Sequence, residues 1–225
     1  MATATAVTNL RPPQQPRLPA ATVDYDINYQ NQLNNVLRLY FNQLDNSLAA
    51  LLNNTGGAYL RNPYGAFSDY NNQTTTANTA TLMGITTTDF SNQVTITSSK
   101  ITVQNAGIYN LQFSVQLQSL DNAPQDVDIW LRQGNDGGTS ADIVGSTGKV
   151  GLPARKNPGD PFHDIKGWNY FLSMAADDYV QIYWSTTSAN VSIATYAASG
   201  TPTKPSTASV VATMSFVSAL PIAPV

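Results

Sequence analysis

The hydrophobic positions of this chain follow two different periods. In the first, between Asn28 and Gly57, apolar residues recur every three or four positions, which places them on one face of a helix. The glycines at 56 and 57 supply a left-handed C-cap. The other positions of the predicted helix are mostly Asn and Gln. The stripe consists of Leu33, Leu37, Tyr40, Leu44, Leu48 and Leu51.

From Asn62 onward the period changes to two, and Gly, Pro, Asn and Asp interrupt it every 8 to 12 residues or so, as in antiparallel sandwiches and barrels. The clearest segment is "GIYNLQFSVQLQSL", in which one face belongs to the core. The other face carries Asn, Gln and Ser and is either exposed to solvent or covered by another subunit. Its predicted core residues are Tyr109, Leu111, Phe113, Val115 and Leu117. No tandem repeat of fixed period is evident. The predicted strands lie near 82–88, 93–97, 100–104, 107–119, 126–133, 141–147, 165–174, 178–186, 191–197 and 208–217.

Two further strand segments carry aromatic residues on the side away from the core. In "DVDIWLRQ", alternation leaves Trp130 on the outward side with Asp128 and Arg132, which suggests an interface. In "DDYVQIYWS", Tyr179 and Tyr183 lie opposite the core side, so we expect this strand to be covered on both sides. The predicted core residues are Val127, Ile129, Leu131, Val180, Ile182 and Trp184.

The first 22 residues contain four prolines, two arginines and no acid, a composition that favours an extended, polyproline-like arm. The arm is either a disordered terminus or a segment ordered against a partner. The predicted organisation is therefore an arm over 1–22, a helix with its connector over 23–57 and a β domain over 58–225. The helix would bury its stripe in a short threefold bundle or against another surface.

Composition narrows the possible functions. Charged residues make up only 11% of the 225 residues and the net charge is −3, so no basic stripe exists for nucleic acid. We expect no membrane span, because no apolar run approaches about 20 residues, and no secretory signal. The absence of cysteine excludes disulfides and thiolate metal sites. It is consistent with assembly in a reducing cytosol or with a fold that is stable without disulfide crosslinks.

Candidate chemistry is sparse. His163 is the only histidine and lies in a Pro/Gly-rich turn, where a solvent-exposed role is expected. Asp126 and Asp128 share a strand face and, with Asp121 and Asp136, could offer oxygen ligands to calcium, although exposed strand-end carboxylates are the simpler interpretation. No paired carboxylates or nucleophile motif emerge, so the sequence predicts a protein that is not an enzyme and has no cofactor or metal.

Four segments together resemble the trimeric jelly roll of the tumour necrosis factor and complement globular-head superfamily. They are "ITVQNAGIYNLQFSVQLQ", "VDIWLRQGNDG", "LSMAADDYVQIYW" and "VVATMSFVS". The resemblance implies a mainly β fold, an antiparallel jelly-roll sandwich, here preceded by an extended arm and one α-helix. It also implies a homotrimer built around a threefold axis.

Nearly the whole chain, from "YQNQLNNVLRLYFNQLDNSLAALL" through "NPYGAFSDYNNQTTT" to "PTKPSTASVVATMSFV", resembles small virion structural proteins of marine and freshwater tailed bacteriophages. This implies a protein made in the host cytoplasm and exposed on the virion surface. The expected function is head decoration, or cement, with the major capsid protein as partner. The alternative is a tail fibre or spike module, attached to a tail or fibre protein, that recognises a host glycan or protein.

The residues expected to make these contacts fall into two groups. The trimer-interface candidates are aromatic residues of the long strands, although Tyr109 and Phe113 could equally be core of one subunit: Tyr109, Phe113, Trp130, Tyr179 and Tyr183. The candidates for contact through the arm and helix are Arg11, Arg17, Leu33, Leu37, Tyr40 and Leu44.

Overall fold

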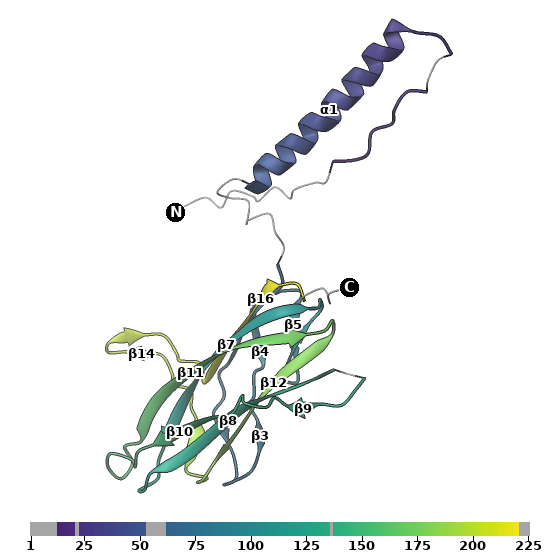
Figure 1. Ribbon diagram of the computed structural model, residues 1–225. Helices are drawn as coiled ribbons and strands as arrows, with labels where there is room; N and C mark the ends of the chain where they lie inside the picture. The colour runs from purple at the N-terminus through teal and green to yellow at the C-terminus, as the bar shows by residue number, and fades with distance from the viewer. Residues whose placement is uncertain (1–12, 21–22, 53–61, 136, 221–225) are drawn as a thin grey trace. The chain divides into compact units, whose positions relative to one another are not determined.

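The computed structural model describes residues 13–20, 23–52, 62–135 and 137–220 (Figure 1). The chain divides into two units, Met1–Arg61 and Asn62–Val225. In the first unit, residues 13–20 contain neither helix nor strand, and a single helix, α1, spans Ile27–Leu52. The predicted helix is thus confirmed, whereas its glycine cap lies outside the described residues.

Asp26 begins this helix. Its carboxylate oxygen accepts a hydrogen bond of 2.8 Å from the backbone N–H of Asn28, and its carbonyl accepts one of 3.0 Å from Gln30. A side-chain acceptor of this kind satisfies one of the backbone donors that a helix leaves unpaired at its start. The N-cap explains why the helix begins at Ile27.

The second unit is a mainly β antiparallel sandwich of the predicted jelly-roll class, made of two large sheets (Figure 1). In the first sheet, β7 pairs with β11 along one edge and with β16 and β13 along the other; β1, β4 and β2 complete it. Its strands are β1 (Tyr64–Asp69), β2 (Gln73–Thr74), β4 (Thr87–Asn92), β7 (Gly107–Ser119), β11 (Phe162–Met174), β13 (Val191–Ile193) and β16 (Val210–Ser218).

The second sheet has the order β10-β8-β12-β6-β5, with β3 also paired to β12 and β9 to β8. Its strands are β3 (Thr81–Leu82), β5 (Val94–Thr97), β6 (Lys100–Val103), β8 (Gln125–Asn135), β9 (Ala141–Asp142), β10 (Gly148–Leu152) and β12 (Asp178–Thr186). A small hairpin of β14 (Ser199–Gly200) and β15 (Thr203–Lys204) stands apart from both sheets.

One core lies between the sheets, because each long strand sends every second side chain inward. All the predicted core residues of β7, β8 and β12 are buried, and Trp184 and Tyr109 are the largest fully buried side chains. The alternation that was visible in the sequence therefore fixes which side of each sheet faces the core.

Several strand predictions were wrong in detail. The predicted strand over 191–197 is only β13, which ends at Ile193, and β11 begins at Phe162, so His163 lies in a strand and not in a turn. No strand was predicted over 64–69, where β1 lies, because its burial is nearly continuous rather than alternating. The predicted strand over 141–147 is only the two-residue β9, followed by a turn, and the sheet continues at β10. The predicted strand over 82–88 is split between β3 and β4, with Met83 and Ile85 buried in the connection between them.

Candidate interaction surfaces

The outer side of the β11-β7-β16 sheet is uncharged. Within these three strands, all of which the structure describes, no Asp, Glu, Lys or Arg projects to the side away from the core. The register aligns the side chains in rows across the strands, for example Thr213, Gln112 and Asn169. We call this surface the amide face; it consists of Asn110, Gln112, Ser114, Gln116 and Gln118 of β7, His163, Ile165, Asn169 and Phe171 of β11, and Val211, Thr213 and Ser215 of β16.

Apolar side chains stand out on the amide face. Phe171 is 66% exposed, Ile165 is 62% exposed and Val211 is 41% exposed. Large apolar side chains scattered singly on a surface are ordinary, but here they share one face with neutral amides and with no Asp, Glu, Lys or Arg. A surface of this kind loses little when it is removed from water against another protein, because no ion has to be stripped of its hydration.

Three of the amides of this face are hydrogen-bonded to one another. Asn110 donates to the side-chain oxygen of Asn169 on the neighbouring strand, and Gln112 donates to the side-chain oxygen of Asn110 at 2.9 Å. Farther along, the Tyr196 hydroxyl lies 2.7 Å from His163 Nδ1 and 3.1 Å from the Gln118 side-chain oxygen. These bonds restrict the orientations of Asn110, Gln112, Asn169 and Gln118.

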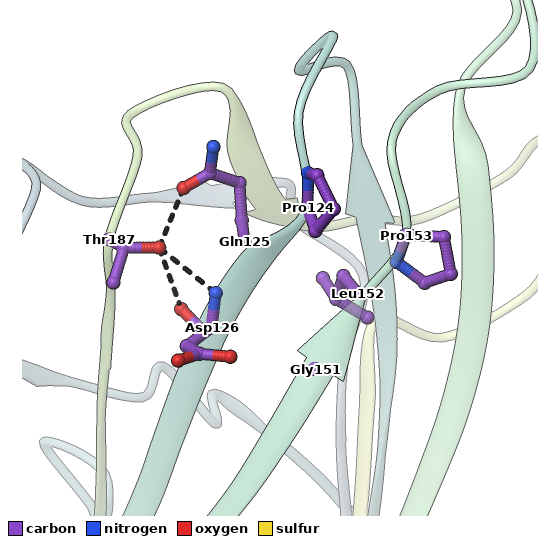
Figure 2. A pocket seen from close by; sticks show the side chains of 7 residues that line it. All are labelled: Pro124, Gln125, Asp126, Gly151, Leu152, Pro153 and Thr187. Atoms are coloured by element: carbon purple, nitrogen blue, oxygen red, sulfur yellow. Dashed lines mark hydrogen bonds between the residues drawn. The ribbon is translucent and has the colours of Figure 1, made fainter.

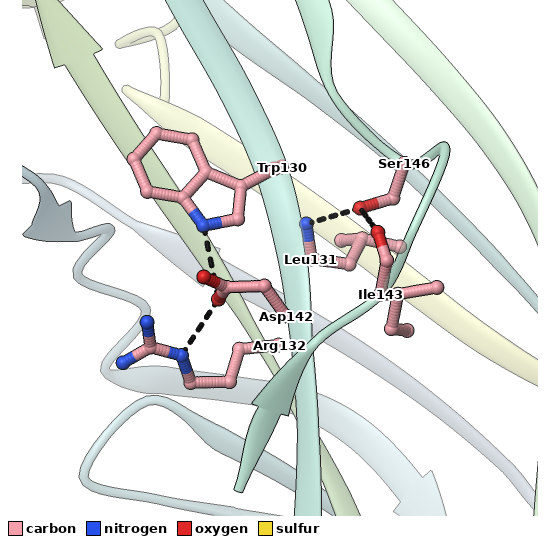
Figure 3. A network of polar contacts seen from close by, with 6 residues as sticks. All are labelled: Trp130, Leu131, Arg132, Asp142, Ile143 and Ser146. Atoms are coloured by element: carbon pink, nitrogen blue, oxygen red, sulfur yellow. Dashed lines mark hydrogen bonds and ion pairs between the residues drawn. The ribbon is translucent and has the colours of Figure 1, made fainter.

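The outer side of the opposite sheet is charged (Figure 3). The carboxylate of Asp142 accepts hydrogen bonds from Arg132 Nε at 2.8 Å and from Trp130 Nε1 at 3.1 Å. The hydrogen bond from Arg132 is the main cause that lowers the pKa of Asp142, and the bond from Trp130 lowers it further. Tyr183 stacks on Trp130 with ring centroids 5.9 Å apart, and the Arg132 guanidinium lies 4.2 Å from the centre of the Tyr183 ring. Trp130 is thus outward with Arg132, as predicted.

The five aromatic interface candidates occupy three different environments. Tyr109 and Phe113 lie in the core between the sheets, the position within one subunit that the sequence left open. Tyr179 is only 6% exposed and lies beneath the ammonium of Lys100, 4.2 Å from its ring centre. Trp130 and Tyr183 are half-buried on the charged side. None of the five lies on the amide face.

A shallow depression of about 710 Å³ lies beside the start of β8 and the end of β10 (Figure 2). Thr187 lies at its edge, where its hydroxyl donates to the Gln125 side-chain oxygen at 2.6 Å and accepts from the Asp126 backbone N–H at 2.9 Å. The apolar part of the lining comes from two prolines and one leucine. The lining residues are Pro124, Gln125, Asp126, Gly151, Leu152, Pro153 and Thr187.

The carboxylates considered for calcium are engaged with protein groups. Lys149 Nζ lies 3.5 Å from an oxygen of Asp126 and 3.6 Å from one of Asp128. Asp121 accepts a hydrogen bond of 2.6 Å from Ser188, which is the main cause that lowers its pKa. Asp136 lies outside the described residues. In the part of the chain that the structure describes, no group of three or more His, Cys, Asp or Glu side chains could hold a metal ion.

The arm and helix candidates lie in the first unit. Leu33, Leu37, Tyr40 and Leu44 are all half-buried residues on one side of α1. Arg17 is exposed, and Arg11 lies outside the described residues. Among the described helices, none is long and apolar enough to cross a membrane.

Sequence reasoning located the polar side of β7 but missed the amide face as a whole. The missing signal is the register, which places the outward residues of β11 and β16 next to those of β7. Once those strands are aligned, the sequence shows that none of their outward positions is Asp, Glu, Lys or Arg. Comparison with known proteins adds no relative: no protein-family model matches the chain, and no curated protein matches it.

Proposed function

We propose that this protein is a homotrimeric structural protein of a tailed-phage virion, in which three sandwiches pack through their amide faces. The amide face is the observation that carries the proposal, because an uncharged surface with exposed Phe171 and Ile165 suits a permanent protein contact. The charged side of each sandwich would then face water.

The size of the amide face is compatible with such a contact. β7 and β11 each contain 13 residues, so the face is about 40 Å long and, across three strands, about 14 Å wide. This area is of the same order as the roughly 800 Å² per partner of a standard protein interface. A closed ring of three copies repeats this contact without leaving an open end.

Within the virion, we propose that the trimer decorates the head at the virion surface and binds the major capsid protein. The support is the sequence resemblance, together with an arm that has four prolines and no acid. Three arms on one trimer would bind as a single multivalent ligand, so each contact with the shell can be weak.

Two measurements test this proposal. Light scattering on the purified full chain should give three times the 24.1 kDa chain mass. Quantitative gel densitometry of purified particles should give a copy number close to that of the shell subunits. A monomeric chain would overturn the trimer, and a copy number far below that of the shell subunits would overturn the head-decoration role.

The depression near Thr187 favours a second candidate, a fibre or spike module that recognises a host glycan. A shallow surface with a carboxylate, an amide and a hydroxyl offers polar groups suited to sugar hydroxyls. In a glycan array, binding that is lost in Thr187→Val but retained in Val144→Ala would support this candidate. Val144 is fully exposed in the loop after β9.

A further inference from the structure

The helix α1 contains an internal repeat of 11 residues. "YQNQLNNVLRL", residues 29–39, and "YFNQLDNSLAA", residues 40–50, are identical at six of their eleven positions. The identical positions are Tyr29 and Tyr40, Asn31 and Asn42, Gln32 and Gln43, Leu33 and Leu44, Asn35 and Asn46, and Leu37 and Leu48. This corrects the expectation that the chain has no repeat of fixed period.

The repeat sets the path of the apolar stripe along the helix. With Tyr29 included, the stripe advances by four, four and three residues and then repeats these steps as far as Leu51. Eleven residues over three turns correspond to about 3.67 residues per turn, the period of helices that wind around one another in a shallow right-handed sense. The stripe runs for about 33 Å, and none of its seven side chains is buried, with Leu48 46% exposed and Leu51 39% exposed.

We infer that α1 packs in parallel and in register against α1 of other copies of this chain, through the stripe from Tyr29 to Leu51. A second copy is the partner that fits, because the stripe keeps one period over the length of the helix and a copy carries the same period. A surface without this period would not match the apolar positions of the stripe along its whole length.

The charge pattern also fits like-with-like packing. Arg38 and Asp45 are the only charged residues of α1, and neither belongs to the stripe. Gln32 and Gln43 lie beside the stripe, and a neutral amide both donates and accepts hydrogen bonds, so it can meet its own copy without repulsion.

The number of helices in the bundle rests on the proposed homotrimer, whereas the parallel register does not.

The absence of cysteine from the chain makes single-cysteine crosslinking a clean test in the full-length protein. Ser47→Cys places a thiol at the edge of the stripe by a nearly isosteric change, and Asn46→Cys places one on the opposite side of the helix. Leu33→Cys and Asn31→Cys form the equivalent pair near the other end.

After mild oxidation, we expect Ser47→Cys and Leu33→Cys each to give disulfide-linked dimers at least about tenfold faster than Asn46→Cys and Asn31→Cys. An antiparallel arrangement would instead link Leu33→Cys to Ser47→Cys only when the two variants are mixed. Light scattering on the same samples, together with gel densitometry of purified particles, separates the failures. A trimer without preferential crosslinking overturns the helix inference alone, whereas crosslinked chains that are absent from particles overturn the virion function alone.

Discussion

The ring of Trp168 on β11 stacks on the ring of Phe113 on β7, with centroids 5.2 Å apart and an interplanar angle of 14°. The two residues are also direct partners in the strand register. Phe113 is therefore part of the core that holds the edge strand β11 to the sheet, rather than a residue of the amide face.

This packing predicts a stability defect for Phe113→Ala. Removing a buried phenylalanine ring costs about 3–5 kcal/mol of unfolding free energy, because the cavity left behind is only partly refilled. Val144→Ala, at a fully exposed position, should stay within about 0.5 kcal/mol of the parent. Urea unfolding at one fixed chain concentration measures both, since association shifts apparent stability. Loss of assembly at unchanged stability would instead place Phe113 at an interface.

Asp26 provides a second prediction, about the start of α1. Its carboxylate accepts the Asn28 backbone N–H, so Asp26→Ala should cost about 1 kcal/mol of helix stability, whereas Asp26→Asn should cost little because asparagine also caps well. Hydrogen exchange of the first-turn amides of the full chain would report the difference. Equal exchange in the two variants would contradict the N-cap.

The Asp142 carboxyl provides a third prediction, about pH. Its pKa is lowered mainly by the hydrogen bond from Arg132 and then by that from Trp130. Arg132→Gln should therefore raise the pKa of Asp142 towards the ordinary value of about 3.9, and Trp130→Phe should raise it by less. NMR titration of the side-chain carboxyl measures both shifts, and an unchanged pKa in Arg132→Gln would refute the assignment.

The direction of the stability effect follows from the lowered pKa. Ionised Asp142 stabilises the folded state at pH values above the ordinary aspartate pKa, and this contribution is lost as the pH falls through the lowered pKa of the folded state. The Arg132 guanidinium stays charged throughout. Since the Asp142 side chain is 50% exposed, solvent screening keeps the contribution small.

The sequence predicted the sandwich well where strands alternate and poorly where they do not. In β7 the alternation of apolar and amide residues gave the bounds and the buried side correctly. In β1 five consecutive residues are buried, so no period of two existed to be found. The short β9 and the turn after it depend on Ser146. Its buried hydroxyl accepts a hydrogen bond from the Leu131 backbone N–H and donates one to the Ile143 carbonyl (Figure 3). No local sequence pattern predicts these contacts.

The interaction surfaces were predicted less completely, for a physical reason. A large aromatic side chain looks the same in sequence whether it fills its own core, as Tyr109 does, or lies outside it, as Trp130 does. The amide face, in contrast, depends on which strands are neighbours. That information resides in long-range register, such as the pairing of Asn169 with Gln112, which one strand's sequence does not contain.

The amide face leads to the last prediction, about assembly. If three copies meet through this face, a lysine at Phe171 or Ile165 would have to lose its hydration inside the contact. Phe171→Lys and Ile165→Lys should therefore weaken association at least about tenfold in sedimentation velocity. Both side chains are more than 60% exposed in one chain, so unfolding of the dissociated chain should change by no more than about 0.5 kcal/mol. Val144→Lys, which adds the same charge to an exposed loop, is the matched control and should assemble like the parent. If Phe171→Lys and Ile165→Lys also assemble like the parent, the amide face is not the contact between copies.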